Sequence, residues 1–382
     1  MRIALVRRVC SLKKAGAERY CINLMRQLKS KGHDVTIVGE SMDESLKSEA
    51  AHLRVPVVRW TSWTKNSSLA RNARKVFENQ GFDIVHGLSR VYGLDTYRLT
   101  DPLQTHWLNV FYRGPWTQAL QRLNPRHRTI LGIEKQLFGP QGPRRIIVQS
   151  KLDERLLQEY FGIDPARIRR VSNGVDTKVF HPDLQHEREF VRDEWKIPHD
   201  APLLTFASMD FRRKGLASLL TAISRAKTSG LWLMVIGDGD IARFKTMAQQ
   251  LGLGDRLVFT GRQQQIARLY AASDLFVLPT IYEPFPNVNL EAMACGVPVL
   301  TTSTAGGADV IEPAINGYVV SSPDEIDCLA DRIDFHFGRG TTQLKLMSAA
   351  ARSTAQRHTP EVNAERTLAV FQEVLGEKKA AA

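Results

Sequence analysis

The sequence predicts an α/β fold built from two Rossmann-like, doubly wound domains. Its 382 residues exceed the usual size of one compact domain, and 43% of them are hydrophobic, which suffices for two cores. Short apolar runs alternate along the chain with segments of helical period. Because this alternation is typical of parallel strands joined by helices, we expect one such domain in each half.

Four apolar runs predict strands of the first domain, which we expect over residues 1–176. They stand at 1–6, 35–38, 83–86 and 145–148. A Gly-containing loop at 11–16 and an amphipathic segment follow the first run, so the chain there has the strand, helix, strand order of a parallel unit. The last run leads through Ser150 into a helical segment.

Six further runs predict the second domain, expected over residues 177–355. A polar stretch at 181–200 separates the halves, and the runs stand at 203–206, 232–236, 257–260, 275–278, 297–301 and 318–320. Residues 356–382 indicate a C-terminal helix, for which we consider packing back on the N-terminal domain. In sheets of this type ligands bind beyond the carboxyl ends of the strands, so we search the loops there first.

Positive charge is concentrated in the first half of the chain. Residues 1–170 contain 30 Lys and Arg against 15 Asp and Glu, whereas the remainder contains 22 against 25. A positive field favours anionic partners, which include nucleic acid, an acidic lipid surface and a phosphorylated substrate. The charge alone leaves these three classes of partner open.

Cysteine usage and hydropathy indicate a reduced, cytoplasmic protein. The four cysteines form neither a CxxC pair nor a metal-ligand spacing, so we expect no metal site. The first twenty residues carry charges where a signal peptide has its apolar core. No stretch approaches the roughly 20 apolar residues that cross a bilayer, so any membrane association is expected to be peripheral.

The segment 282–296 is the most informative part of the sequence. Two prolines stop the preceding strand, and a helix follows that ends at a glycine. N–H groups of Val288 and Asn289 at the helix start suit a diphosphate. Glu283 and Glu291 stand on either side to accept from hydroxyl groups, which favours a sugar nucleotide as the ligand. An ordinary helix start, with Glu291 stabilising the helix dipole and Glu283 in solvent, fits the same residues.

Several motifs together resemble the family-four retaining glycosyltransferases, whose GT-B fold has two Rossmann-like domains facing across a deep cleft. Besides Glu283 and Glu291, the resemblance rests on segments 272–279 and 296–299 and on Asn173-Gly174-Val175-Asp176, Arg213-Lys214-Gly215 and Gly237-Asp238-Gly239. Further motifs make the chain most similar to the lipopolysaccharide core glucosyltransferases: Gly93-Leu94-Asp95, Asp101, Ile133-Glu134-Lys135 and Phe211-Arg212-Arg213-Lys214-Gly215.

The resemblance implies a donor site in the second domain. Arg213 and Lys214 would neutralise the leaving diphosphate, and Glu283 would hold hydroxyl groups of the sugar. Glu291 would accept from the ribose, with the diphosphate at the helix start. Departure of a diphosphate builds negative charge, which positioned cations stabilise whatever the family.

The resemblance also implies roles for residues outside this group. Arg262, after Gly261, lies where main-chain groups read the edge of the nucleobase. Gly16 lets the backbone approach a ligand after the first strand, although the family has two adjacent glycines there and this chain has one. Asp101 and His106 both fall where the family supplies a polar residue facing the reacting carbon, and the sequence leaves the choice between them open.

The implied function is transfer of a hexose from a nucleotide-diphosphate sugar, with UDP as the expected nucleotide, to a glycan acceptor. Lipopolysaccharide core or a related surface polysaccharide is the expected acceptor. Transfer is expected to retain configuration and to need neither a metal ion nor a cofactor beyond the donor. The alternatives are a nucleotide-sugar epimerase of the same fold and a nucleic-acid-binding protein that uses the basic half.

Two stretches that mix aromatic residues with Arg and Lys, at 60–75 and 113–128, suit an anionic interface. A solvated helix face is the alternative for both. Because the basic half would hold a lipid-linked or phosphorylated acceptor, we expect peripheral attachment to the inner face of the cytoplasmic membrane. Neither nucleic acid nor an obligate protein partner is expected.

Overall fold

The computed structural model describes residues 1–12 and 16–381, and the chain forms two compact units. Unit 1 comprises Met1–Ser172 and Pro360–Ala382, and unit 2 comprises Asn173–Thr359. The first boundary therefore follows Ser172 rather than residue 176, and the second lies at Pro360 rather than at residue 356. Residues 13–15 of the expected loop at 11–16 lie outside the described residues.

Unit 1 is built on a seven-stranded sheet. The strands of the unit are β1 Arg2–Val6, β2 Val9–Cys10, β3 Asp34–Gly39, β4 Ser41–Met42, β5 Ala51–Arg54, β6 Ile84–Gly87, β7 Thr96–Arg98, β8 Arg145–Val148 and β9 Ile168–Arg170. Its helices are α1 Ala17–Ser30, α2 Ser62–Phe77, α3 Gln104–Phe111, α4 Pro115–Leu123, α5 Pro125–Leu137, α6 Lys151–Phe161 and α14 Pro360–Ala380, with short 3₁₀ turns at Glu44–Leu46 and Pro165–Arg167.

The sheet of unit 1 has the order β5-β3-β1-β6-β7-β8-β9, and every neighbouring pair in it is parallel. Successive strands extend from β1 toward β5 and then from β6 toward β9, so the direction of growth reverses between β1 and β6. Doubly wound sheets bind ligands at the carboxyl ends of the strands beside such a reversal. The loops after β1 and β6 therefore occupy the position where unit 1 is expected to bind.

Unit 2 contains a second parallel sheet, of six strands, in the order β12-β11-β10-β13-β14-β15. The strands are β10 Leu203–Ser208, β11 Trp232–Gly237, β12 Leu257–Gly261, β13 Leu275–Leu278, β14 Val299–Thr302 and β15 Gly317–Val320. The helices are α7 Arg188–Glu194, α8 Leu216–Arg225, α9 Ile241–Gln250, α10 Ile266–Ala271, α11 Asn287–Ala294, α12 Ile326–Phe337 and α13 Thr341–Gln356, with 3₁₀ turns at Pro182–Glu187, Gly254–Arg256 and Gly306–Val310. Here the strand order reverses between β10 and β13.

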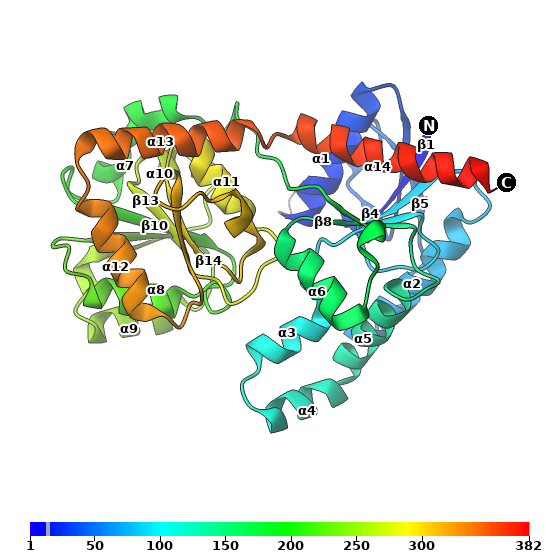
Figure 1. Ribbon diagram of the computed structural model, residues 1–382, viewed down its shortest axis with the longest axis horizontal. Coiled ribbons are helices and arrows are strands. Elements are labelled where there is room, and N and C mark those ends of the chain that lie inside the picture. Colours follow the sequence, from blue (N-terminus) through cyan, green and yellow to red (C-terminus); the bar gives the residue numbers. More distant parts are fainter. Residues whose placement is uncertain (13–15, 382) are drawn as a thin grey trace. The chain divides into compact units, whose positions relative to one another are not determined.

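Helices cover both faces of the sheet in unit 2, with α8, α9 and α12 on one face and α10, α11 and α13 on the other (Figure 1). Burial on both faces explains why β10 and β13 are almost continuously apolar rather than alternating. The two doubly wound sheets confirm the fold class expected from the sequence.

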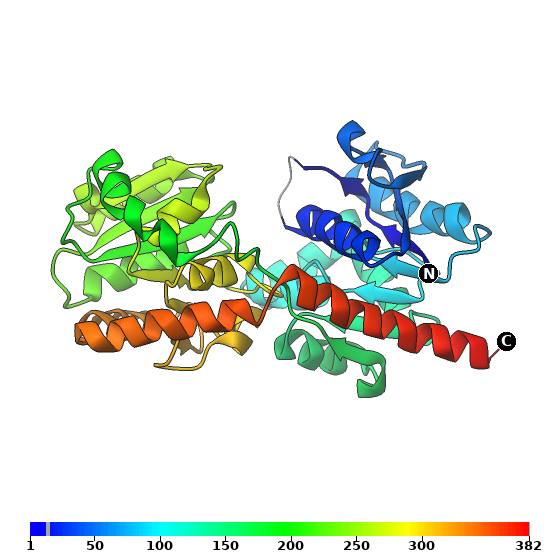
Figure 2. The same cartoon turned by 90° about the horizontal axis from the view of Figure 1, so that it is seen from above.

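The C-terminal helix α14 belongs to unit 1, where it lies beside α1 in both views (Figure 1, Figure 2). Phe371 is fully buried against the ring of His86, with ring centroids 4.9 Å apart. Arg145 at the start of β8 donates to Glu373 at 2.9 Å. Apolar burial and ion pairing together hold the C-terminal helix on the sheet that the N-terminal part of the chain forms.

None of the helices in the described ranges combines the length and apolar character that crossing a membrane requires.

Candidate active site

The loop after β10 carries the basic pair Arg213 and Lys214, and it approaches the end of β13 closely. Gly215 has φ +81°, and a Cβ atom at that position would lie 1.9 Å from the carbonyl oxygen of Pro279. The carbonyl oxygen of Arg213 accepts hydrogen bonds from the Ile281 N–H at 3.0 Å and from the Thr280 hydroxyl at 3.2 Å. Only glycine fits this approach, which joins the two loops beside the reversal of strand order.

Glu283 joins this basic pair through its side chain. Its Oε2 accepts from a guanidinium nitrogen of Arg213 and lies 2.8 Å from Nζ of Lys214. The backbone of Glu283 is itself held, because its carbonyl oxygen accepts from the Gly306 N–H at 2.8 Å. The structure thus brings Glu283 into contact with the adjacent Arg213 and Lys214, although Glu283 lies 70 positions after Arg213 in the sequence. All three are predicted catalytic residues.

The Lys214 side chain is only 9% exposed, and it lies near both the negative charge of Glu283 and the positive charge of Arg213. Burial lowers the pKa of Lys214 despite the attraction of Glu283, and the nearby charge of Arg213 lowers it further. Burial alone would raise the pKa of Glu283, but Lys214 and Arg213 outweigh it and hold that pKa below its usual value. Lys214 therefore shares the partly buried carboxylate of Glu283 with Arg213, which also lies 3.4 Å from the half-exposed Asp210. A buried cation whose paired carboxylate is shared favours a further anion.

The predicted diphosphate site at the start of α11 differs from the expectation in one respect. The N–H of Asn289 donates to the carbonyl oxygen of Pro286 at 3.1 Å, so that N–H is already engaged. The Asn289 side chain is fully buried, and its amide atoms have no hydrogen-bond partner among the described residues. Val288, by contrast, is partly exposed.

The remaining predicted donor residues lie on neighbouring elements of unit 2. On α11, Oε2 of Glu291 accepts from the hydroxyl of Tyr270 at 3.4 Å. Burial, reinforced by Glu291, raises the pKa of Tyr270. Arg262 follows β12 and pairs with Asp238 at 3.0 Å, with 71% of its side chain exposed.

In unit 1, the predicted residues Asp101 and His106 have different environments. Nδ1 of His106, on α3, lies 3.1 Å from the hydroxyl of Tyr160, and burial lowers the pKa of His106 to about 4. The Asp101 side chain is 42% exposed and lies 3.5 Å from Nη1 of Arg90. Gly16 begins α1 with φ +70°, a conformation that favours glycine.

Sequence reasoning gave no role to Arg7 and Arg90, which follow β1 and β6 at the reversal in unit 1. Arg7 donates to Glu18 at 3.1 Å and to the carbonyl oxygen of Leu88 at 2.7 Å. The signal that identifies both arginines is their position in the loops after the two strands, with Arg7 directly after β1 and Arg90 three residues after the end of β6. Recognising it requires the strand order and not only the strands.

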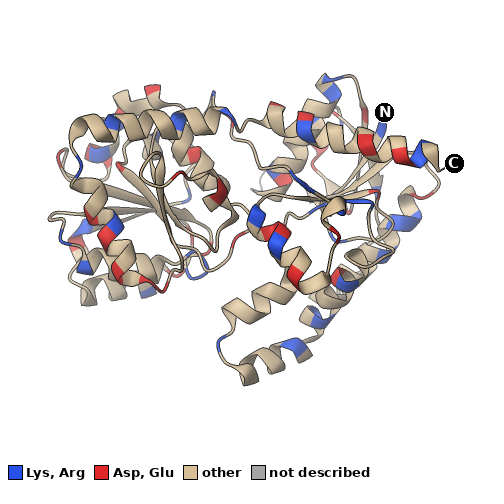
Figure 3. Ribbon diagram, in the orientation of Figure 1, with Lys and Arg blue, Asp and Glu red and all other residues tan. Residues whose placement is uncertain are grey.

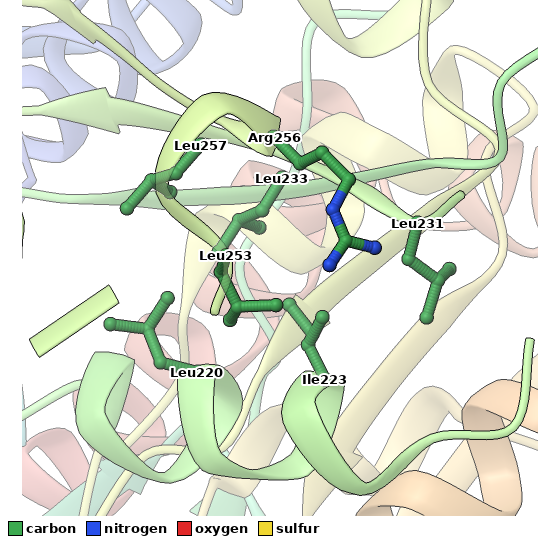
Figure 4. Close-up of a pocket in the computed structure, with 7 residues that line it drawn as sticks. All are labelled: Leu220, Ile223, Leu231, Leu233, Leu253, Arg256 and Leu257. Atoms are coloured by element: carbon green, nitrogen blue, oxygen red, sulfur yellow. The ribbon is translucent and has the colours of Figure 1, made fainter. Parts of the chain in front are cut away.

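A small apolar recess in unit 2 lies away from these residues (Figure 4). It is lined by Leu220, Ile223, Leu231, Leu233, Leu253, Arg256 and Leu257. None of the predicted site residues lines it, so it carries no functional assignment.

Two family models match the chain: "Glycosyltransferase Family 4" over residues 15–179 and "Glycosyl transferases group 1" over residues 187–352. Lipopolysaccharide glucosyltransferase WaaG of Escherichia coli K12 is 25% identical over 315 residues, which are 81% of this chain and 82% of that protein.

Solved structures match the fold over almost the whole chain. The crystal structure of WaaG matches with a TM-score of 0.80 at 22% identity, covering 97% of this chain and 99% of that one. Anabaena Alr3699/HepE in complex with UDP-glucose matches with a TM-score of 0.71 at 17% identity, covering 100% of both chains.

Fold and site together define an enzyme of the GT-B class, a glycosyltransferase with a charged cluster at the strand reversal of unit 2. The two models between them span most of the sequence, including all ten predicted site residues. The chain belongs to the family-four, group 1 glycosyltransferases and is related to WaaG.

Proposed function

We propose that the enzyme transfers a hexose from a UDP-sugar to a glycan acceptor of the lipopolysaccharide core or a related surface polysaccharide, with retention of configuration. The observation that carries the donor assignment is that the buried Lys214 and the partly buried Arg213 both pair with the one carboxylate of Glu283. The relatives support the substrate classes, since one is named a lipopolysaccharide glucosyltransferase and a solved match contains UDP-glucose.

The proposed chemistry needs positive charge where the diphosphate leaves. The bond between the sugar carbon and the diphosphate oxygen breaks, and the acceptor hydroxyl forms the new bond on the same face of the sugar. The hydroxyl proton passes to an oxygen of the leaving diphosphate. Arg213 and Lys214 stabilise the developing negative charge, which is the service that a metal ion supplies in other enzymes, and we propose a mechanism without metal or cofactor.

Other residues of unit 2 orient the donor in this proposal. Glu283 accepts from hydroxyl groups of the sugar, and Glu291 accepts from the ribose. Val288 donates its N–H to the diphosphate at the start of α11, with the Asn289 side chain beside it. Arg262 lies against the base. In unit 1, Gly16 and Asp101 are the residues proposed to approach the substrates.

We also propose peripheral attachment to an anionic membrane through α4. Trp116, Leu120 and Leu123 share one face of this helix by their spacing and are at least 66% exposed. α4 also contains Arg122, and α5 contains Arg126, Arg128 and Lys135 (Figure 3). An apolar face beside cationic side chains is the pattern by which helices lie at a headgroup interface.

Sedimentation with vesicles tests this attachment. The wild type is expected to bind vesicles that contain anionic lipid and not neutral ones, and Trp116→Ala with Leu120→Ala is expected to abolish binding. Leu346, equally exposed on α13 of unit 2, provides the control variant Leu346→Ala. Equal failure of the wild type with both vesicle types would remove the proposal.

Melting temperatures with a panel of nucleoside diphosphates test the donor assignment, because a ligand that binds only the folded state raises the melting temperature. UDP is expected to give a shift that Lys214→Ala abolishes, while Lys245→Ala, which changes an exposed lysine on α9, retains it. A shift with oligonucleotides and none with any nucleotide would contradict the proposal. Both family models and WaaG are glycosyltransferases, and they support neither the epimerase nor the nucleic-acid alternative.

A further inference from the structure

A second network of charged residues lies at the strand reversal of unit 1, and the proposed function gives it no role. Arg90, in the loop after β6, donates through Nε to Oε1 of Glu134 at 3.1 Å, and its Nη2 lies at the same distance from that oxygen. Glu134, on α5, has no exposed side-chain surface, and Arg90 is 15% exposed. The two residues form a buried ion pair that links a strand end to a helix.

Arg90 also reaches the segment that joins β7 to α3. Its Nη2 donates to the carbonyl oxygen of Pro102 at 2.6 Å, and its Nη1 lies 3.5 Å from Oδ2 of Asp101. One guanidinium therefore contacts Glu134 on its buried side and Asp101 on its outer side. A guanidinium has its donors in fixed directions, so holding one side of it sets the direction of the other.

Glu134 holds the same segment a second time. Both of its carboxylate oxygens accept from the Gln104 N–H, at 2.9 and 3.1 Å. Gln104 is the first residue of α3, and the preceding Leu103 has no side-chain oxygen to cap the helix. The carboxylate of α5 thus acts as the cap of α3, where its charge also suits the helix dipole.

Burial raises the pKa of Glu134 even though Arg90 and the N–H groups of Gln104 and Thr105 oppose the rise. The network is thus a costly way to fix a loop, because an apolar pair of similar volume generally does so at a lower desolvation cost. What apolar packing lacks is the fixed direction of a guanidinium toward a carboxylate. Among the described residues, the carboxylate on the outer side of Arg90 is that of Asp101, whose side chain is 42% exposed.

We propose that Arg90 is a positioning residue for the transfer reaction: held by Glu134, it sets the direction of the Asp101 carboxylate and the start of α3 relative to the substrates. This inference rests on the proposed function. Arg90 itself acts through Asp101, so replacing it leaves donor binding to unit 2 unchanged. Its effect falls on turnover once both substrates are bound.

Kinetics of three variants test this inference, with UDP affinity measured by calorimetry on each. Arg90→Lys keeps the charge and loses the fork of donors, and it is expected to lower kcat about 10- to 100-fold while UDP affinity stays within about twofold. Glu134→Gln keeps the side-chain volume and loses the charge that holds Arg90, and it is expected to lower kcat in the same way.

Arg145→Lys is the matched control, because Arg145 is 14% exposed and pairs with Glu373 and Glu377 at the amino end of β8, whereas Arg90 follows the carboxyl end of β6 in the same sheet. This variant is expected to lose melting temperature to the same extent as Arg90→Lys and to retain kcat.

A double-mutant cycle separates positioning from a purely structural role. If Arg90 acts through Asp101, then Arg90→Lys lowers kcat no further in an Asp101→Asn background. Full additivity of the two losses would overturn the inference, and so would a folded Arg90→Lys with the kcat of the wild type. If the wild type binds UDP and transfers sugar, and Arg90→Lys has the same kcat, the inference alone is refuted. If the wild type transfers no sugar, the proposed function is refuted as well.

Discussion

The two units place a cluster of cations and carboxylates at the same point of their sheets, but the clusters differ in charge balance. In unit 2, Lys214 is 9% exposed and shares the partly buried carboxylate of Glu283 with Arg213, which also lies 3.4 Å from Asp210. In unit 1, Arg7 pairs with Glu18 and Arg90 with Glu134. Of these four cations, Lys214 is the buried one that shares its paired carboxylate with a second cation, which favours an added anion beside it.

The total charges of the units point the other way. Unit 1 contains 33 Lys and Arg against 19 Asp and Glu, and unit 2 contains 19 against 21. Much of the excess in unit 1 lies on helices, among them α2 and α5 (Figure 3). The net charge of a domain therefore indicates which surfaces attract anions, whereas the site for an anionic group depends on the few charges that are buried together.

The largest expected effect follows from removing charge from the cluster of unit 2. Lys214→Ala is expected to lower kcat about 100- to 1000-fold, the usual loss when one group that stabilises developing negative charge is removed. Glu283 remains paired with Arg213, so the fold is expected to survive. Initial rates at saturating donor, with circular dichroism as the folding control, measure this; near-normal turnover would contradict the assigned role.

A smaller loss of kcat is expected from substitutions in unit 1. Its size in each variant decides whether Asp101 or His106 faces the reacting carbon. Asp101→Asn is expected to lower kcat about 100-fold, because the half-exposed carboxylate is the group that Arg90 presents. His106→Gln is expected to stay within about threefold, since this buried ring is neutral at pH 7 and bound to Tyr160. The opposite order of the two effects would make His106 the residue at the reacting centre.

The charge imbalance in unit 2 also predicts how UDP binding depends on pH. Without ligand the pKa of Lys214 lies below its usual value, and a bound diphosphate adds negative charge that raises it. Binding therefore takes up a proton at pH values between the two pKa values of Lys214, so affinity falls as pH rises through that range toward the usual lysine pKa of about 10. Calorimetry on the wild type and on Lys214→Met measures this, and an equal slope in both proteins would contradict it.

The strands could be predicted from the sequence because their signal is local. The apolar runs at 35–38 and 275–278 correspond to β3 and β13 within one residue at each end. The strands β5 and β7 were missed, since their sequences AHLR and TYR contain polar and charged residues and no apolar run. An uninterrupted apolar run thus decided which strands were found, because β13 has only four residues, all of them apolar.

Spacing in the sequence limited what could be predicted of the site. Glu283 and the basic pair were recognised as separate motifs, and their resemblance to a family placed them together. Arg90 and Glu134 lie 44 positions apart, and only the strand order and the path of α5 bring them into contact. A single sequence contains no local signal for such a pair, although Glu134 stood in a recognised motif.

The smallest expected effect concerns Arg262, the exposed counterpart of the buried cluster. The side chains of Arg262 and Asp238 are 71% and 53% exposed, so water screens the attraction between their charges. An ion pair of this kind contributes little to holding the Arg262 side chain in one position. Arg262→Ala is expected to weaken UDP binding by less than about fivefold and to leave kcat unchanged. Calorimetry with UDP and with CDP sharpens the comparison further, because a residue that lies against the base changes the ratio of the two affinities, whereas a general loss of positive charge weakens both equally. If Arg262→Ala weakened UDP binding as much as Lys214→Ala does, solvent exposure would not distinguish the Arg262–Asp238 pair from the cluster of Lys214 and Glu283.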